Sequence, residues 1–195
     1  MSDTSEAATT AGTDLALSRA LLIDAFGRVA ESLPGVLDGL RGAELLWRPD
    51  PDANSIGWLV WHLTRVQDDH LAGVAEREQI WASAGFAERF NLPYAARSIG
   101  YGQSSDEVGA FSVTDGSLLA AYHAAVHAET VAIVQGLSAS DFERIVDRRW
   151  DPPVTAAVRL VSVVNDITQH AGQVAYLRGL VERRRTDADS RAATS

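Results

Sequence analysis

Apolar residues recur at helical spacing in four long segments of the chain. In the first segment they return at three-, four- and seven-residue intervals between Thr13, the predicted N-cap, and Pro34, before which the helix should stop. The second segment covers residues 56–77, with Asn54 or Ser55 as its N-cap. Both segments predict amphipathic helices.

Two further helices are predicted in the second half of the chain. One begins after the candidate caps Ser112 and Thr114 and ends near Gln135. The other begins after a cap at Thr155, ends near Arg184, and would be about 45 Å long at 1.5 Å per residue. No stretch alternates apolar and polar residues with the β-branched content of a strand. The pattern therefore predicts an all-α fold, a four-helix bundle.

The connection between the second and third helices is long for a compact domain. Residues 79–111 combine a short helical pattern with Gly100 and Gly102, and long ordered connections tend to carry function. Elsewhere, residues 47–55 predict an ordered loop, and Ser140-Asp-Phe-Glu143 has the capping-box pattern that opens a short helix.

The length and composition predict one domain. A chain of 195 residues, 46% of them hydrophobic, can bury a single sizeable core, which we assign to residues 14–184. Residues 1–13 and 185–195 are small and polar and bury little surface, so we expect flexible tails there. The sequence has neither a secretory signal nor an apolar run of about 18 residues, so we expect a cytoplasmic protein without a membrane partner.

Cysteine and lysine are both absent from the sequence. This excludes disulfides, cysteine-ligated zinc, iron–sulfur clusters, a protein thiol nucleophile and lysine Schiff bases. All 17 basic residues are therefore arginines, and the formal net charge of −9 opposes binding to nucleic acid phosphates. Any metal site must use histidine, carboxylate or water ligands.

One group of residues offers metal chemistry. Asp166 and His170 are four residues apart in the last helix and can reach one point, and His62 on the second helix is a candidate third ligand. Two imidazoles and one carboxylate form a set used by catalytic zinc and by some non-haem iron. Such spacing also arises by chance, so a hydrogen-bonded surface pair beside a core histidine stays open as the alternative.

Other polar residues admit both functional and structural interpretations. His123 and His127 repeat the four-residue spacing, but no motif nearby supplies a third ligand, so a solvated helix face, or one histidine as a hydrogen-bonding core residue, is the better interpretation. Asp69 is the one candidate for a catalytic or ligand-supporting carboxylate, and the simpler interpretation is an exposed acid. Arg159 and Arg178 could bind an acidic substrate or form surface ion pairs. The five tryptophans are expected to fill the core or anchor loops.

The segments around these candidates resemble the DinB-like superfamily. The resemblance is carried by residues 47–49 (WRP), 54–63 (NSIGWLVWHL) and 163–179 (VVNDITQHAGQVAYLRG), and it covers roughly residues 14–184. Within the superfamily the sequence is most similar to the mycothiol-dependent branch, which shares a metal-binding domain with maleylpyruvate isomerase. The additional C-terminal domain of the isomerases is not found in this sequence, so we do not expect their specific reaction.

The resemblance implies a four-helix bundle that binds a divalent metal through His62, Asp166 and His170. Many relatives have His at the position of Asp166, and the mycothiol-dependent isomerases have Glu there, one methylene longer. Zinc is the metal expected, with nickel or iron as alternatives.

The function expected from this resemblance is a metal-dependent S-transferase. The metal would activate the sulfur of a low-molecular-weight, mycothiol-type thiol, and the thiolate would attack an electrophilic substrate. The partners would then be a small-molecule thiol and an electrophile. One alternative is a non-catalytic, stress-related bundle stabilised by the metal and dimerising through apolar helix faces, and another is a metal-dependent hydrolase with the same ligands.

Overall fold

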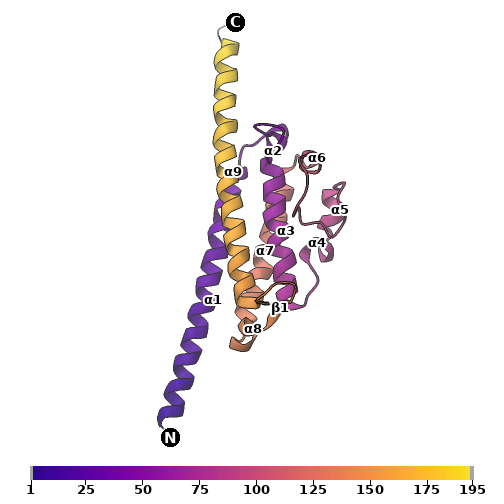
Figure 1. Ribbon diagram of the computed structural model, residues 1–195. Helices are drawn as coiled ribbons and strands as arrows, with labels where there is room; N and C mark the ends of the chain where they lie inside the picture. Colours follow the sequence, from indigo (N-terminus) through magenta and orange to yellow (C-terminus); the bar gives the residue numbers. More distant parts are fainter. Residues whose placement is uncertain (1, 194–195) are drawn as a thin grey trace.

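Four long helices dominate the structure, a computed structural model that describes residues 2–193 and the side chains of residues 12–192. They are α1 (Ser2–Leu37), α3 (Ile56–Ala75), α7 (Gly116–Gly136) and α9 (Ala156–Ala193). The helices lie side by side, with α3 against α9, α1 against α7, and further contacts between α3 and α7 and between α1 and α9 (Figure 1). The predicted all-α four-helix bundle is confirmed.

The core of the bundle is a continuous cluster of buried apolar side chains from all four long helices. Its largest fully buried members include Phe26 of α1, Trp61 of α3, Tyr122 of α7 and Leu160 of α9. Burial of such side chains is the main favourable contribution to folding. Because the buried side chains pack closely, they fix the four helices relative to one another.

The remaining helices are short and lie in the connections. They are α2 (Gly42–Leu46), α4 (Ile80–Ser83), α5 (Phe86–Phe90), α6 (Ser105–Gly109) and α8 (Ala139–Glu143). The long connection between α3 and α7 holds α4, α5 and α6 and packs along one side of the bundle (Figure 1). The short helical pattern predicted there corresponds to α4 and α5.

Two of the predicted N-caps are confirmed. The Ser55 hydroxyl accepts a hydrogen bond from the Trp58 amide at 3.2 Å and opens α3, and Thr155 accepts from Val158 at 3.3 Å and opens α9. The cap predicted for the third helix at Ser112 or Thr114 is wrong, because the Asp115 carboxylate accepts the first free amides of α7.

The predicted capping box at residues 140–143 is also displaced. Ser138 caps α8, and its partner is Asp141, whose carboxylate accepts from the Ser138 amide at 2.8 Å. The local sequence offers two overlapping Ser-x-x-acid patterns, and the shorter aspartate completes the one that forms.

The ends of the outer helices lie beyond the predicted limits. α1 begins at Ser2, before the predicted cap at Thr13, because residues 2–12 contain three alanines and no proline. It also continues past Pro34 to Leu37, where the Asp38 amide donates to the Pro34 carbonyl at 3.0 Å. α9 continues past Arg184 to Ala193, through residues without proline or glycine.

Both outer ends project from the bundle in opposite directions (Figure 1). Residues 1 and 194–195 of the predicted tails lie outside the described residues. The flexibility of residues 1–13 and 185–195, and the domain limits 14–184, stay predictions.

A small antiparallel ribbon corrects the expectation that the fold has no strands. β1 (Ile145–Asp147) pairs with β2 (Val154–Thr155), with an irregular register between Ile145 and Asp147. Strands of three and two residues are too short to produce a visible alternation in the sequence. The ribbon connects α8 to α9 and places Asp147 beside the first turns of α9.

By length and composition alone, α7 is apolar enough to cross a membrane, and within the described part of the chain it is the one helix that is. This differs from the sequence expectation, which counted only uninterrupted apolar runs. In the structure α7 packs against α1 and α3 and buries Leu119, Tyr122, Val126 and Ile133, as a core helix of a bundle does.

Candidate metal centre

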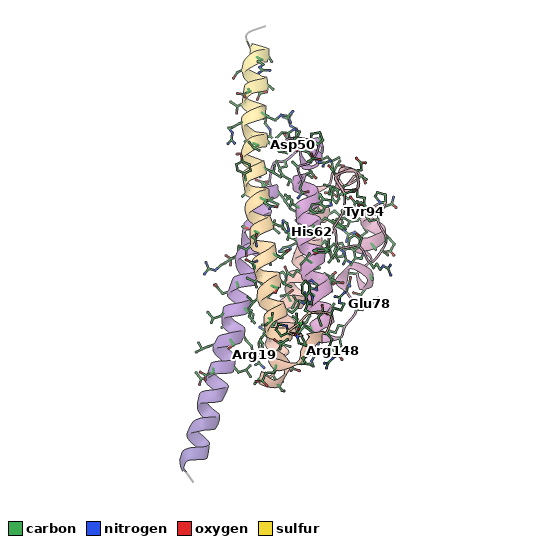
Figure 2. All side chains as sticks on the ribbon, viewed as in Figure 1. Arg19, Asp50, His62, Glu78, Tyr94 and Arg148 are labelled. Carbon is green, nitrogen blue, oxygen red and sulfur yellow. The ribbon has the colours of Figure 1, made fainter. Side chains whose placement is uncertain are left out.

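Three side chains predicted as ligands meet between α3 and α9. One potential ligand atom from each of His62, Asp166 and His170 lies within 4.8 Å of the other two. Nε2 of His170 is 3.8 Å from Oδ1 of Asp166, and the rings of His62 and His170 meet edge to face with centroids 4.8 Å apart. Figure 2 labels His62 midway along α3, on the part of the helix beside α9. Among the residues that the structure describes, this is the one cluster of three or more potential metal ligands.

The two helices position these residues by their apolar faces. Val163 and Ile167 of α9 are almost completely buried, and Asp166 and His170 follow them on the same side of the helix with the spacing of one turn. On α3, His62 lies between buried Trp61 and Leu63 and is only 6% exposed. The site is therefore part of the packed interface between α3 and α9, although its α9 side remains partly exposed to solvent.

The imidazole of His62 is held by the long connection. Its Nδ1 lies 2.5 Å from the carbonyl oxygen of Ile99, and its ring stacks on Trp58 with centroids 4.7 Å apart and planes 17° from parallel. Because the carbonyl can only accept, Nδ1 carries the proton and donates it. The lone pair of Nε2 is then available to a metal.

Gly100 permits this approach of the connection to His62. Its φ is +89°, and a Cβ atom at this position would lie 2.7 Å from Nδ1 of His62 and 3.0 Å from the rings of Trp58 and Trp61. Only glycine combines that backbone conformation with so close a contact.

His170 has a corresponding partner on its own helix. Its Nδ1 lies 2.9 Å from Oε1 of Gln173, so the amide oxygen accepts the Nδ1 proton and leaves Nε2 free. Ligating histidines in proteins commonly donate their second N–H to a carbonyl or carboxylate in this way, which fixes the tautomer and the ring orientation.

The third ligand atom lacks a partner. Oδ1 of Asp166 is buried and accepts no hydrogen bond. A buried carboxylate oxygen without a partner is costly, and a cation between the three side chains would remove that cost. Burial lowers the pKa of His62, which outweighs the opposing effect of the Ile99 carbonyl, so the imidazole stays neutral as metal binding requires. The donor set and its surroundings fit a divalent cation.

The second histidine pair lies elsewhere and has no third ligand. The rings of His123 and His127 on α7 are stacked with centroids 6.5 Å apart, and His123 contacts the Thr64 hydroxyl at 3.2 Å. Within the described residues they join no cluster of three potential ligands. His123 is 3% exposed and bonded to Thr64, which confirms the alternative of one histidine as a hydrogen-bonding core residue, and a solvated helix face applies at most to His127.

Asp69 does not join the three candidate ligands. It lies two turns along α3 from His62, and its Oδ1 accepts a hydrogen bond from the Gln79 amide at 2.7 Å while Oδ2 is 3.4 Å from Nδ1 of His70. Helical spacing alone predicts that Asp69 lies near the face of α3 that carries His62. In the structure its carboxylate bonds to Gln79 and so belongs to a separate group of side chains. No catalytic role at the triad follows for Asp69.

The other candidates have mainly structural partners. Arg159 pairs with Asp147, and Arg178 donates to three carbonyls at the end of α1. Among the tryptophans, Trp58, Trp61 and Trp81 are buried as expected, whereas Trp150 is exposed because it lies in the turn between the two strands.

Sequence reasoning missed the carbonyl of Ile99, the role of Gly100 and the stacking of Trp58. The glycines at 100 and 102 were the available signal, since paired glycines in a long connection often mark a close backbone approach. The partner that Gly100 approaches could not be read from them, because it lies on another element.

Comparison with known proteins places the chain in a family. The DinB superfamily profile matches residues 25–174, most of the bundle and all three clustered side chains. The chain belongs to the DinB superfamily. This confirms the resemblance at the level of the superfamily, and the mycothiol-dependent branch stays a proposal. A search among curated proteins gave no match.

A solved structure agrees with the fold. The crystal structure of a conserved protein from Enterococcus faecalis is similar to this DinB superfamily chain, with 30% sequence identity and a TM-score of 0.77. The match covers 83% of this chain and 95% of the Enterococcus chain. The bundle described above is therefore shared with an experimentally determined structure.

Proposed function

We propose that this DinB protein is a divalent-metal-dependent enzyme that transfers a low-molecular-weight thiol of the mycothiol type to an electrophilic substrate. The observation that carries the proposal is the triad of His62, Asp166 and His170, with both Nδ1 atoms engaged and Oδ1 of Asp166 without a partner. A divalent cation held there, for which we propose zinc, would lower the pKa of a coordinated thiol and supply thiolate at neutral pH.

The protein's own residues would bind and orient. His62 is oriented by its contacts with Ile99 and Trp58, and His170 by Gln173, so two ligands are preorganised on the helices. Both α9 side chains keep some solvent exposure, His170 19% and Asp166 38%, and this is the side from which a thiol would enter. Because the protein has no cysteine, the sulfur must arrive with the substrate.

The number of protein ligands, three, favours a catalytic metal site over a purely structural one. Structural zinc sites are usually closed by four protein ligands, whereas catalytic sites keep three and an open position. The count supports exchange of a small-molecule ligand at the triad. It does not separate thiol transfer from hydrolysis, so the experiment must.

The test combines elemental analysis with thiol titration. Purified wild type should contain about one divalent metal per chain, whereas His170→Ala and the triple alanine variant of the triad should lose it. His127→Ala is the matched control, since it removes a helix histidine outside the cluster and should keep the metal. In cobalt-loaded protein, mycothiol or N-acetylcysteine should give a thiolate-to-metal absorption band that His170→Ala lacks.

Each other outcome argues for a different function. If the triple variant kept its metal content, the triad would not be the metal site. Metal without thiol binding, together with ester hydrolysis in the absence of thiol, would favour the hydrolase.

A further inference from the structure

A second polar site lies where the end of α3, the β-ribbon and the start of α9 meet. A cavity of about 320 Å³ is lined by the end of α3, by β1 and the turn after it, and by the first turns of α9. Its polar lining comes from these residues: Asp69, His70, Arg77, Gln79, Asp147, Arg149 and Arg159. In Figure 2 the label of Arg148, the neighbour of Arg149 in the chain, marks this end of the bundle, and His62 lies nearer the middle of α3. None of the roles proposed above uses this cavity.

The cavity is separate from the triad. His70 follows His62 by eight residues and Arg159 precedes Asp166 by seven, which is two turns on each helix, or about 10 to 12 Å at 1.5 Å per residue. No side chain of the triad lines the cavity. A ligand here would therefore have its own contacts, and the inference does not depend on the metal.

The α9 side of the cavity offers unused hydrogen-bond donors. Asp147 accepts from Arg149 through Nε at 3.0 Å and a terminal nitrogen at 2.9 Å, and from Arg159 at 2.9 Å. Two guanidinium groups thus share one carboxylate. Within the described chain, that single bond to Asp147 is the only one made by Arg159, whose side chain is 18% exposed. Its remaining N–H groups suit a ligand carboxylate.

The α3 side offers unused acceptors. Nδ1 of His70 is 3.4 Å from Oδ2 of Asp69, and Nε2 of His70 has no partner among the described residues. Burial and the charge of Arg159 lower the pKa of His70, so the imidazole is neutral at neutral pH. Because the Asp69 carboxylate beside Nδ1 can only accept, the single proton belongs on Nδ1, and Nε2 presents a lone pair. Asp69 is one-third exposed and places its carboxylate beside the same imidazole. These acceptors suit a ligand ammonium group.

We propose that this cavity binds a zwitterionic α-amino acid group, with its carboxylate on Arg159 and its ammonium group on Asp69 and His70. A ligand with only one of the two charges would satisfy one wall and leave the other without a partner. A dianionic phosphate would also meet the carboxylates of Asp69 and Asp147. The group could belong to a free amino acid or to the γ-glutamyl end of a peptide, which share this chemistry.

In the experiment, L-norvaline is added to metal-free protein whose arginine side chains are labelled with ¹⁵N. Saturable shifts should appear at the Nε–H signal of Arg159. Butyrate, which lacks the ammonium group, and butylamine, which lacks the carboxylate, should bind at least tenfold more weakly. Equal binding of either analogue would overturn the proposal, as would a response of the exposed Arg28 equal to that of Arg159.

Two pairs of variants locate the site. Arg159→Gln should weaken L-norvaline binding at least tenfold, whereas Arg28→Gln, which alters an exposed arginine paired with one aspartate, should leave it unchanged. Gly73 lines the cavity, and a Cβ there meets nothing within 4 Å, so Gly73→Leu should fill the space without disturbing the helix. Gly27→Leu is its control on α1, also with open space.

Further outcomes are decisive in the same way. Retained binding in both Arg159→Gln and Gly73→Leu would place the amino acid elsewhere and overturn the proposal. Tighter binding of γ-glutamylglycine than of L-norvaline would identify a peptide source, and the reverse a free amino acid. Since the protein is metal-free throughout, failure of the metal-dependent function would leave these results unaffected.

Discussion

At the scale of single residues, the orientation of His62 depends on Gly100. An alanine there would place its Cβ 2.7 Å from Nδ1 of His62, so the ring or the connection must shift and the bond to Ile99 is lost. We expect Gly100→Ala to weaken metal binding about 10- to 100-fold, the usual effect of removing a partner of a ligating histidine. Competition with a chromophoric chelator measures it.

Gly102→Ala is the matched control for that variant. Gly102 also has a positive φ, +72°, but a Cβ there meets nothing within 4 Å. Both variants should therefore share the backbone cost, about 1 kcal/mol of stability, and only Gly100→Ala should lose metal affinity. Equal loss in both variants would contradict the role of the contact with His62.

A second residue-scale prediction concerns His123, which is buried between α7 and α3. Burial, assisted by His127, lowers the pKa of His123 to about 4. The unfolded chain, with an ordinary pKa near 6.5, then binds this proton more readily than the folded protein, so stability falls as the pH decreases from about 6.5 to about 4. At pH 5 this titration lowers the free energy of unfolding by about 2 kcal/mol.

Urea unfolding at pH 7 and pH 5 measures this effect. The wild type should lose stability between these pH values, and His123→Phe should lose about 2 kcal/mol less. Phenylalanine keeps an aromatic ring at this position and removes the titration, while Thr64 keeps its bond to the Val60 carbonyl. An unchanged pH dependence in His123→Phe would show that another group titrates.

Among the site residues, those on one helix were the most predictable from sequence. Asp166 and His170 follow from a spacing of one turn, because helical geometry alone brings them together. His62 could be named only as a candidate third ligand from the sequence, since its position depends on how α3 packs on α9. The Ile99 carbonyl lies in irregular structure, where no repeating pattern exists, and so it required the coordinates.

At the scale of elements, Asp147 connects the β-ribbon to α9. Its carboxylate is almost buried, and hydrogen bonds from Arg149, with the charges of Arg149 and Arg159, hold its pKa far below the usual range. The ionised form therefore stabilises the fold at and above about pH 4, and this contribution is lost as the pH falls through the depressed pKa.

Asp147→Asn tests this connection. We expect the variant to be less stable than the wild type at pH 7 and to lose less of its remaining stability between pH 4 and pH 2, as measured by thermal melts followed by circular dichroism. Asp24→Asn is the control, because Asp24 is exposed and its one ion pair among the described residues is with Arg28, and it should change little. A wild-type acid transition identical to that of Asp147→Asn would contradict the assignment.

Helix ends show why element limits were less predictable than element identities. The sequence placed the end of the first helix before Pro34, yet α1 continues to Leu37. One guanidinium of Arg178, over 140 residues later in the chain, donates to the carbonyls of Gly35, Val36 and Asp38 there. Such long-range capping satisfies carbonyls that the local sequence leaves free.

At the scale of the whole molecule, the number and order of long helices followed from periodicity because each helix buries a wide apolar face. The ribbon between α8 and α9 did not, because its strands are too short to show a period. The triad and the cavity are properties of the assembled bundle, since each combines residues of α3 with residues of α9.

The assembled bundle also determines what metal removal should do. The ligands connect only α3 and α9, whereas the buried core includes all four long helices, so the fold should survive without metal. Metal at 100 times its Kd would add about 2.7 kcal/mol, which for a chain of this size is roughly 5 to 10 °C in Tm. Calorimetry with and without EDTA should show a shift of that size and a folded metal-free state, with no shift in His170→Ala. Unfolding by EDTA at room temperature would instead support the metal-stabilised, non-catalytic bundle.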